Sequence, residues 1–325
     1  MTSALVCGAG GFGLTWTTAL SRAGVDVVGV IDPSATAIQE FRAQLTANVP
    51  AFDSLSEATE ETSADFVLDS SPFSHRETNA SLAFEAGMDL LGAKPLGGSL
   101  EQSERIIGLA GSMGRRVGVA LQMRFFPCFL ALKHVLRTAQ FGRMRRAKIR
   151  MSLDGRGWIP GMEWRLKLAN PLLLEAGIHH FDLMNWVFGD QPAVHGALAS
   201  NPPWSPFAQN ANFDAVLSVA GSPVLYSGHF APHPDTDSIR FDSGWRVECD
   251  DVVLRVESGG LFADGELIGG EVTQDPLGLD ILNVEVLQRW LDQPLRADDG
   301  LVTGEEYLKA MRPLSEALRE GARGV

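Results

Sequence analysis

The sequence has little cysteine and no long hydrophobic segment, and both absences narrow the class of protein. Its three cysteines, Cys7, Cys128 and Cys249, are far apart and form no C-x-x-C pair, which argues against a disulfide framework or a zinc cluster. No apolar run reaches the length of a transmembrane helix, and the first apolar run begins at about Ala4, too early for a secretion signal to precede it. We therefore expect reduced thiols, no membrane partner and a cytoplasmic location.

The sequence also lacks an excess of positive charge. Its 27 Lys and Arg residues are outnumbered by 40 Asp and Glu residues, which gives a formal net charge of −13 and a pI near 5.0. A protein of that sign repels nucleic-acid phosphates and anionic lipids, so we expect neither as a general partner. Hydrophobic residues make up 45% of the 325 residues, which is the composition of a folded chain long enough for two domains.

What the sequence does have is a glycine-rich motif near its amino terminus. An apolar run leads into a G-x-G-x-x-G pattern, Gly8-Ala9-Gly10-Gly11-Phe12-Gly13, and a second apolar run ends at Asp32, about 20 residues further on. This is the fingerprint of a dinucleotide-binding βαβ unit, in which the glycines permit a tight turn and a close backbone approach to the pyrophosphate. Asp32 is placed to accept hydrogen bonds from the adenosine ribose, and Pro33–Thr36 contains no Arg or Lys that would favour a 2′-phosphate. The predicted cofactor is therefore NAD.

Strands and helices alternate through the first third of the chain, which predicts an α/β fold with a doubly wound parallel sheet. The expected strands are 25–31, 66–69, 89–91 and 116–121, and the expected helices are 14–20, 35–45, 75–86 and 100–111. Ligands of such sheets bind at the carboxyl ends of the strands, where Ser71-Pro72 and Lys94-Pro95 fall. We predict that residues 1–122 form an NAD-binding domain.

Closely spaced extended segments follow residue 122. The expected strands are 144–153, 193–199, 213–220, 224–230 and 245–256, and the expected helices are 127–138, 172–188, 279–291 and 303–321. Their composition and glycine-containing turns indicate hairpins in a large, mostly antiparallel sheet with one open face. We predict that residues 123–325 form an α/β domain for substrate binding and oligomerisation, with 213–256 buried between subunits, although loops of a monomer could also cover such a face.

Five sequence patterns occur in an order that resembles the Gfo/Idh/MocA oxidoreductases, the glucose–fructose oxidoreductase and inositol dehydrogenase group. They are the glycine motif, Ser71–His75, Ala86–Leu96, Leu174–Asp182 and Val302–Glu306, and the resemblance covers essentially the whole chain. It implies a Rossmann domain followed by an α/β domain whose open sheet is used for homodimers or homotetramers. It also implies oxidation or reduction of a hydroxyl or carbonyl on a small-molecule sugar, cyclitol or related polyol.

The resemblance makes Lys94 a catalytic residue. Lys94 and Pro95 match the family's Glu-Lys-Pro motif, although Ala93 replaces the glutamate. An ammonium group here could hydrogen-bond the substrate oxygen and stabilise a developing alkoxide. The alternative is a strand-end lysine that faces solvent.

A second cluster has helical spacing. Glu175 and His179 are related by i, i+4, and His179 and Asp182 by i, i+3, so an α-helix would place all three on one face. The family has Asp-x-x-x-His here, and the resemblance implies that His179 is the general base for oxidation or the acid for reduction, with Glu175 orienting it or binding a hydroxyl. Asp182 is either an inner orienting residue or the partner in a structural hydrogen bond. The alternative for Glu175 and His179 is an exposed helix ion pair. Ala169–Leu172 replaces the glycine-rich stretch that commonly precedes this motif.

Residues around these motifs complete the predicted site. The predicted cofactor contacts are Gly8, Gly10, Gly11, Phe12, Gly13, Asp32, Ser71, Pro72, His75, Lys94, Pro95, Gln122, Trp164 and Arg165. The predicted substrate contacts are Lys94, Gln122, Trp158, Glu175 and His179, and Arg124, Arg156 and Lys167 could border the pocket. Domain packing is the alternative for the supporting residues. The segment 229–237 gathers His and Asp, but its prolines and irregular spacing favour a turn-rich loop, so no metal is predicted.

Three functions remain open at this stage. The first is an NAD-dependent dehydrogenase or reductase acting on a sugar-, cyclitol- or polyol-like hydroxyl or carbonyl. The second, which the resemblance permits, is a hydrolase or lyase that oxidises a sugar carbon transiently and then restores it with the retained NADH. The third is a catalytically silent dinucleotide-binding interaction protein, for which Ala93 and the missing glycine-rich stretch are the only support.

Overall fold

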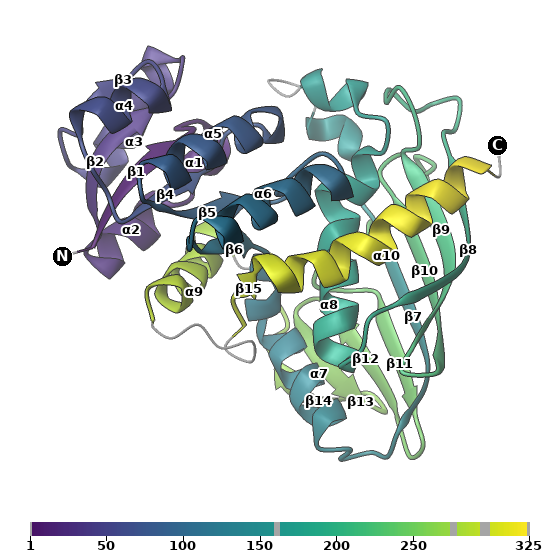
Figure 1. Cartoon of the computed structure of the whole chain (residues 1–325). Coiled ribbons are helices and arrows are strands. Elements are labelled where there is room, and N and C mark those ends of the chain that lie inside the picture. The colour runs from purple at the N-terminus through teal and green to yellow at the C-terminus, as the bar shows by residue number, and fades with distance from the viewer. Residues whose placement is uncertain (1, 159–162, 274–277, 293–299, 324–325) are drawn as a thin grey trace. The chain divides into compact units, whose positions relative to one another are not determined.

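The computed structural model describes residues 2–158, 163–273, 278–292 and 300–323, with the backbone alone at 157, 158, 163, 164 and 323. The chain forms two compact units (Figure 1), one of Met1–Gln122 with Leu277–Leu308 and one of Met123–Pro276 with Lys309–Val325. The sequence predicts a single domain boundary after residue 122, whereas in the structure the segment 277–308 also belongs to the first unit.

The first unit is built on a seven-stranded sheet in the order β15-β6-β5-β4-β1-β2-β3. Neighbouring strands are parallel except for β15, which pairs antiparallel with β6. Every residue of β4 and β6 is buried, as expected for parallel strands covered on both faces. The predicted doubly wound sheet is confirmed. Its strands are β1 (Ser3–Cys7), β2 (Asp26–Ile31), β3 (Ala51–Phe52), β4 (Phe66–Asp69), β5 (Asp89–Ala93), β6 (Val117–Ala120) and β15 (Val302–Thr303).

The helix expected after the glycine motif is two short helices, not one. The Thr15 hydroxyl donates to Phe12 O at 2.7 Å and the Thr17 hydroxyl donates to Leu14 O at 2.8 Å, so side chains compete for carbonyls at the break. The helices of this unit are α1 (Gly11–Leu14), α2 (Thr17–Ala23), α3 (Ala35–Leu45), α4 (Leu55–Glu61), α5 (Phe73–Glu85), α6 (Leu100–Ser112) and α9 (Leu279–Leu291). Sequence reasoning missed α4, although Ser54 caps it by accepting from Glu57 N at 3.2 Å.

Helix α9 explains why a late segment belongs to the first unit. It packs on α2, and its buried Trp290 lies 5.9 Å from the ring of Phe66 and 4.4 Å from the guanidinium of Arg116. A Cβ at Gly118 of β6 would approach the Trp290 ring to 2.9 Å, so this glycine makes room for the indole. The hydrophobic burial of one tryptophan thus ties α9 to the parallel sheet.

The second unit contains an eight-stranded sheet in the order β14-β13-β12-β11-β7-β10-β9-β8. Only β7 and β10 pair in parallel, so the predicted mostly antiparallel sheet is confirmed. The strands are β7 (Met144–Ser152), β8 (Ala193–Ser200), β9 (Asn212–Val219), β10 (Ser222–His229), β11 (Trp245–Cys249), β12 (Val253–Glu257), β13 (Gly260–Ala263) and β14 (Glu266–Gly270). Burial alternates along β9, where Phe213, Ala215 and Leu217 face inward and Asp214 and Val216 face outward.

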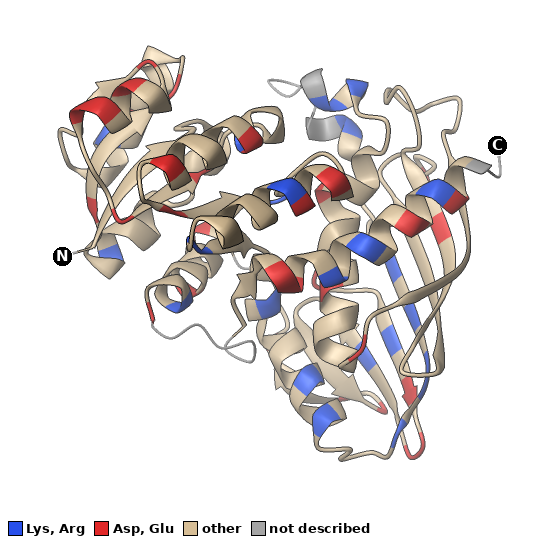
Figure 2. Ribbon diagram, viewed as in Figure 1, with Lys and Arg blue, Asp and Glu red and all other residues tan. Residues whose placement is uncertain are grey.

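Helices cover one face of this sheet. They include α7 (Pro127–Arg137), which packs on β13 and β14, and α8 (Ile178–Phe188), which packs on β9. The final helix, α10, spans Gly304–Arg323. Figure 2 marks Lys and Arg in blue along the ribbon of β7, which carries Arg145, Arg146, Lys148 and Arg150. Within the described ranges, no helix is long and apolar enough to cross a membrane.

Two sequence expectations for this unit were wrong in detail. The strand expected over 245–256 is a hairpin of β11 and β12, because Asp250 lies at a turn where it accepts hydrogen bonds from Arg143 N at 2.8 Å and from Arg145 Nε at 2.5 Å. The helix expected over 172–188 begins with a π-helical turn, Leu173–Gly177, before α8. Strands β13 and β14 were also missed.

Candidate active site

The glycine motif forms a turn whose shape depends on missing side chains. Gly8 has φ +87°, and a Cβ there would lie 2.7 Å from Ser71 N; a Cβ at Gly13 would lie only 2.0 Å from Gly8 O. These two glycines therefore allow β1, β4 and α1 to approach one another. A Cβ at Gly10 or Gly11 would meet nothing within 4 Å, so this side of the turn faces open space in which a pyrophosphate can approach the backbone.

Asp32 lies directly beside this turn. Its Oδ2 accepts a hydrogen bond from Ala9 N at 2.8 Å, and its Oδ1 accepts one from Ser34 N at 2.8 Å. Each carboxylate oxygen has a second lone pair, so both can still accept from ribose hydroxyls. The open turn and the fixed carboxylate fit NAD. Phe12 of α1 packs edge-on against Trp16, which precedes α2, with their ring centroids 6.5 Å apart.

Ser71 and Lys94 follow neighbouring strands of the same sheet. Ser71 follows β4, and both its N–H and its hydroxyl donate to Asp69 Oδ1, at 2.9 and 2.6 Å. Lys94 follows β5, is partly buried and precedes Pro95 through a cis peptide bond. Pro72 and His75 are both exposed at the start of α5. The carboxyl ends of β1, β4 and β5 therefore present the glycine turn, Ser71 and Lys94 at one edge of the sheet.

Gln122 belongs to a buried amide network that the sequence did not reveal. Its Nε2 donates to Asn283 Oδ1 at 3.3 Å, and Asn283 Nδ2 donates to Thr15 Oγ1 at 2.8 Å. Gln122 is thereby linked to the segment that follows the glycine turn. The available signal was one asparagine inside the apolar helix 279–291, a residue type that is buried only with hydrogen-bond partners.

His179 and Glu175 are not on an exposed helix face. The His179 side chain is 5% exposed and its ring lies 6.5 Å from that of Phe241. Glu175 pairs with Arg165, whose Nη2 lies 3.3 Å from Glu175 Oε2. The alternative of an exposed Glu175–His179 ion pair is therefore wrong. The π-helical turn also changes the rotation between the two residues, so the α-helical spacing used for Glu175 does not apply.

The next residue, His180, is buried for a different reason. It is fully buried, its Nδ1 lies 3.1 Å from the Tyr226 hydroxyl, and burial lowers the pKa of its imidazole to about 4. The ring is surrounded by the aromatic rings of Phe241, Trp245 and Tyr226. His180 is therefore a neutral packing residue near pH 7.

Asp182 forms a buried ion pair with Arg124. Arg124 donates through Nε at 2.8 Å and through Nη2 at 2.6 Å to the two carboxylate oxygens, and both side chains are at most 1% exposed. Burial raises the pKa of Asp182, and the charge of Arg124 opposes that shift. Lys133 of α7 lies over the ring of Trp186, which is on α8 with Asp182, with its Nζ 3.8 Å from the ring centroid. Through this pair, Arg124 anchors α8 to the segment that precedes α7.

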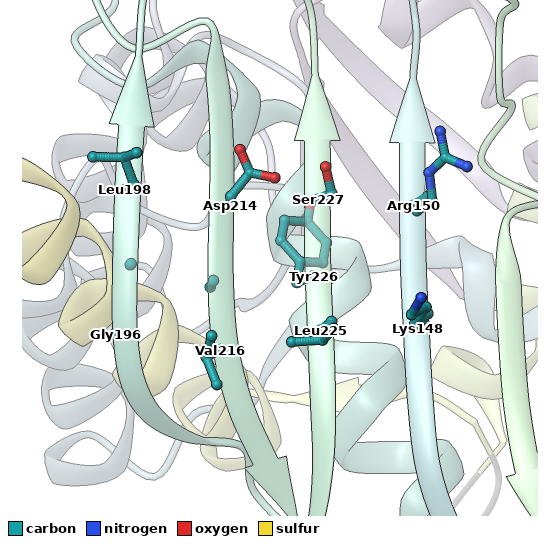
Figure 3. A pocket seen from close by; sticks show the side chains of 11 residues that line it. Lys148, Arg150, Gly196, Leu198, Asp214, Val216, Leu225, Tyr226 and Ser227 are labelled. Carbon is teal, nitrogen blue, oxygen red and sulfur yellow. The ribbon is translucent and has the colours of Figure 1, made fainter.

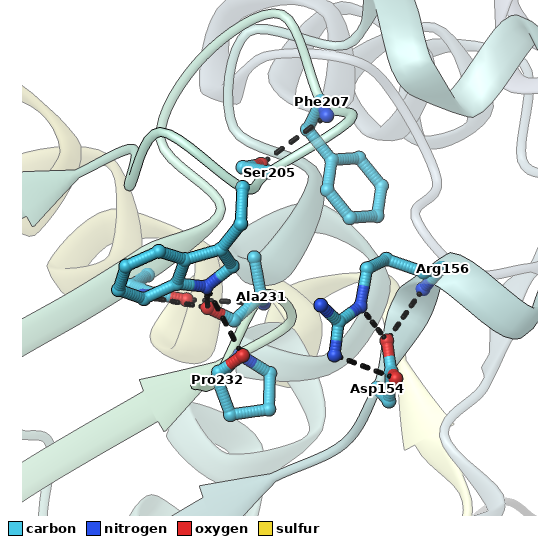
Figure 4. Close-up of polar contacts among 8 residues, drawn as sticks. Asp154, Arg156, Ser205, Phe207, Ala231 and Pro232 are labelled. Atoms are coloured by element: carbon cyan, nitrogen blue, oxygen red, sulfur yellow. Dashed lines mark hydrogen bonds and ion pairs between the residues drawn. The ribbon is translucent and has the colours of Figure 1, made fainter. Parts of the chain in front are cut away.

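Side chains of two loops in the second unit bond within their own surroundings (Figure 4). Arg156 donates to Asp154 through Nε at 2.6 Å and through Nη2 at 2.8 Å, and Trp204 Nε1 donates to the carbonyls of Ala231 and Pro232, both at 3.1 Å. Lys167 is exposed. The side chains of two predicted contacts, Trp158 and Trp164, lie outside the described residues.

The histidines of the loop 229–237 pair with nearby carboxylates. His229 Nε2 lies 3.9 Å from Asp214 Oδ2, and His233 Nδ1 lies 3.5 Å from Asp235 Oδ2. No group of three or more His, Cys, Asp or Glu side chains in the described part of the chain could hold a metal ion.

A hollow of about 560 Å³ lies on the outward face of the second sheet (Figure 3). Its lining includes Lys148 and Arg150 of β7, Asp214 and Val216 of β9, and Leu225 of β10. No predicted cofactor or substrate residue lines it. The hollow therefore marks the face that was predicted to meet another subunit and lies apart from His179, which is on the covered side.

Two family models match this chain in succession. An oxidoreductase-family model described as an NAD-binding Rossmann fold matches residues 2–121, and a Gfo/Idh/MocA carboxy-terminal domain model matches residues 129–245. Inositol 2-dehydrogenase from Corynebacterium glutamicum is 26% identical over 191 residues, which cover 57% of this chain and 54% of that protein. The uncharacterized protein y4oX from Sinorhizobium fredii is 26% identical over 231 residues, 69% of this chain and 64% of that protein. Both matches span less than two thirds of the relative.

Solved structures share the fold over nearly the full chain. An oxidoreductase from Agrobacterium radiobacter in complex with NAD⁺, L-tartaric acid and magnesium gives a TM-score of 0.85 at 15% identity, covering 100% of this chain and 97% of that one. The WlbA dehydrogenase from Bordetella pertussis, in complex with NADH and UDP-GlcNAcA, gives a TM-score of 0.78 at 18% identity, covering 99% of this chain and 97% of that one. Myo-inositol 2-dehydrogenase from Lactobacillus plantarum gives 0.80 at 15% identity, covering 99% and 98%. The chain belongs to the Gfo/Idh/MocA oxidoreductase family, and its first unit is an NAD-binding Rossmann fold.

Proposed function

We propose that this protein is an NAD-dependent dehydrogenase or reductase acting on a hydroxyl or carbonyl of a sugar, cyclitol or related polyol. The observation that carries the proposal is the placement of the open glycine turn, Ser71 and Lys94 at one carboxyl edge of a parallel sheet. Structural neighbours have been solved with hydroxyl-rich ligands, L-tartaric acid and UDP-GlcNAcA, and this supports the substrate class.

In this proposal the first unit holds NAD through residues 8–13, Asp32, Ser71, Pro72 and Gln122. NAD would supply hydride transfer to or from the substrate carbon. Lys94 hydrogen-bonds the substrate oxygen through its ammonium group and stabilises negative charge as the C–H bond breaks. Because Ala93 carries no carboxylate, no anion at that position competes for this ammonium.

The second unit contributes His179, which takes the hydroxyl proton during oxidation and returns it during reduction. The adjacent His180 is unsuited to that role because its low pKa and its contact with Tyr226 keep it neutral in the core. Glu175, held by Arg165, orients the imidazole or accepts a hydrogen bond from a neighbouring hydroxyl. The buried pair of Arg124 and Asp182 fixes the helix that carries His179.

The test is turnover by purified protein with NAD and a panel of polyols, aldoses, inositols and sugar acids, followed as NADH absorbance. Lys94→Ala and His179→Ala should each lower kcat by about 10²–10⁴, the usual cost of losing a positioned proton-transfer group, while NAD binding persists. Lys309→Ala and His134→Ala, which remove exposed side chains of the same types, serve as matched controls. Wild-type kcat in both Lys94→Ala and His179→Ala would contradict the proposal.

The same assay, with glycosides added to the panel, separates the alternatives. Release of an aglycone from a glycoside without net NADH would identify transient oxidation by a hydrolase or lyase. Binding of NAD without turnover of any member would favour an interaction protein.

We also propose that the open face of the second sheet meets a second copy of this chain in a homodimer or homotetramer. Leu198 and Val216 are about half exposed on that face, beside the basic side chains of β7. Light scattering at micromolar concentration tests this, and a compact monomer would contradict it.

A further inference from the structure

Two buried side chains hold the backbone on either side of Lys94. On the amino-terminal side, Arg76 of α5 donates through Nη1 to Ala93 O at 2.5 Å. On the carboxy-terminal side, the Tyr307 hydroxyl of α10 accepts a hydrogen bond from Leu96 N at 3.1 Å. Arg76 is 1% exposed and Tyr307 is 0% exposed, so water competes with neither bond. The segment 94–96, called the Lys94 turn below, is thus held at both of its ends.

Arg76 also connects this turn to the neighbouring strand end. Its Nη2 donates to Ser71 O at 2.7 Å, and its Nε lies 3.2 Å from Asp69 Oδ2. One guanidinium therefore bridges the segments that follow β4 and β5. Asp69 is 0% exposed and supplies the opposite charge that a buried guanidinium requires.

The strand β5 is adapted to this arrangement. A Cβ at Gly92 would lie 2.9 Å from Arg76 Nη1, so glycine leaves the space that the guanidinium occupies. The donors of arginine form a rigid planar fork, whereas a lysine ammonium has no fixed directions. Arg76 can therefore set the relative positions of the Ser71 and Ala93 carbonyls in a way that a buried lysine cannot.

We propose that Arg76 and Tyr307 are positioning residues that fix the Lys94 turn, and with it the point from which the lysine ammonium reaches the substrate oxygen. This inference rests on the proposed function of Lys94. Small displacements of a reacting group are costly, since about 1 Å of misplacement can lower a rate by on the order of 10². Neither residue touches the substrate in this proposal; both act through the backbone that carries Lys94.

The sharpest test is Tyr307→Phe, which deletes one oxygen and keeps the buried ring. In the protein without NAD, hydrogen exchange at the Leu96 amide should accelerate by about fivefold, the effect of losing one ordinary hydrogen bond. The kcat should fall by roughly three- to tenfold with little change in KM for NAD, because the glycine turn and Asp32 are untouched. The pH profile of kcat should also shift, because the environment of the Lys94 ammonium changes.

A second variant, Arg76→Lys, keeps the charge beside Asp69 and loses the planar fork. We expect kcat to fall by roughly 10- to 100-fold. Arg116→Lys is the matched control, because Arg116 pairs with Asp89 at the opposite end of β5, with Nε 2.6 Å from Asp89 Oδ2. That control should retain the wild-type kcat and pH profile.

The outcomes separate this inference from the proposed function. If Lys94→Ala abolishes turnover while Tyr307→Phe keeps the wild-type Leu96 exchange rate, kcat and pH profile, positioning is overturned and the role of Lys94 stands. If Lys94→Ala retains turnover, the proposed function fails. Hydrogen exchange at the Leu96 amide in Tyr307→Phe then still shows whether the Tyr307 hydroxyl holds the Lys94 turn. If Tyr307→Phe and Arg76→Lys lower thermal stability and leave the pH profile of kcat unchanged, both residues serve only in packing and the proposal is overturned.

Discussion

The glycine turn of the first unit and the His179 helix of the second unit are held by different means. In the first, backbone shape does most of the positioning: Gly8 and Gly13 permit contacts that a Cβ would prevent, and Ala9 N holds Asp32. In the second, His179 lies on a helix fixed by buried side-chain pairs such as Arg124–Asp182. Backbone positioning can be recognised in a sequence from the spacing of its glycines. Pairs of side chains from distant segments produce no local sequence pattern.

The strongest test of this contrast compares Gly13→Ala with Gly10→Ala. A methyl at Gly13 would lie 2.0 Å from Gly8 O, so the turn must shift. We expect Gly13→Ala to lower the unfolding free energy by about 3 kcal/mol and to abolish NAD binding. A methyl at Gly10 meets nothing within 4 Å, so stability should change by no more than about 0.5 kcal/mol. NAD affinity should nevertheless fall, because the methyl enters the space for the pyrophosphate. Urea denaturation and NAD titration measure both effects, and equal stability of the two variants would contradict the steric argument.

The second unit should respond to acid through His180. Burial lowers the pKa of the folded His180 imidazole to about 4, against 6.5 for an exposed histidine. Between these two values the unfolded chain therefore binds a proton that the folded chain does not. The contribution of His180 to stability is therefore complete above pH 6.5 and declines as the pH falls towards 4. The total loss is about 3 kcal/mol, from about 1.36 kcal/mol per pKa unit.

The measurement is the unfolding free energy of wild type minus that of His180→Gln, which does not titrate, between pH 4.5 and 7.5. The difference should fall with decreasing pH. His134→Gln, at an exposed position, should run parallel to wild type. A constant difference between wild type and His180→Gln would show that the buried imidazole does not control the acid response.

The mildest expected effect concerns cofactor choice. Wild type should bind NAD(H) more tightly than NADP(H), because the Asp32 carboxylate accepts from the ribose hydroxyls and repels a 2′-phosphate. Asp32→Asn keeps the shape of the side chain and removes its charge. It should weaken NAD(H) binding by roughly tenfold, as expected for a hydrogen bond to a charged group, and so reduce the difference in affinity between NAD(H) and NADP(H). Titration calorimetry measures both affinities, and a wild-type preference for NADP(H) would refute the assignment.

Much of the fold could be predicted because local chemistry marks its boundaries. The expected helix 35–45 coincides with α3, which Ser34 caps by accepting from Ala37 N at 3.2 Å and which ends at Thr46 in the left-handed region, φ 54°. The hairpin of β11 and β12 was read as one strand because residues on both sides of Asp250 have strand composition. The π-helical turn before α8 has no compositional signature, so the continuous helix expected there was wrong at its start.

The candidate site shows the same limit. Gly8, Gly13 and Asp32 could be found because their spacing along the chain is fixed by one βαβ unit. The partners of Gln122 and Leu96 could not, since Asn283 is 161 residues away from the first and Tyr307 is 211 residues away from the second. The roles of Lys94, Glu175 and His179 in turnover stay predictions.

The return of residues 277–308 to the first unit has a consequence for biosynthesis. The ribosome makes the whole second sheet before it makes Trp290, Asn283 and Tyr307, which complete the core and the polar contacts of the Rossmann unit. At about 5–20 residues per second, the first 122 residues would wait roughly 10–40 s for these partners. During that interval the Trp290 side of β4 and β6 is uncovered. The core of the first unit is therefore completed only after translation has passed Leu308.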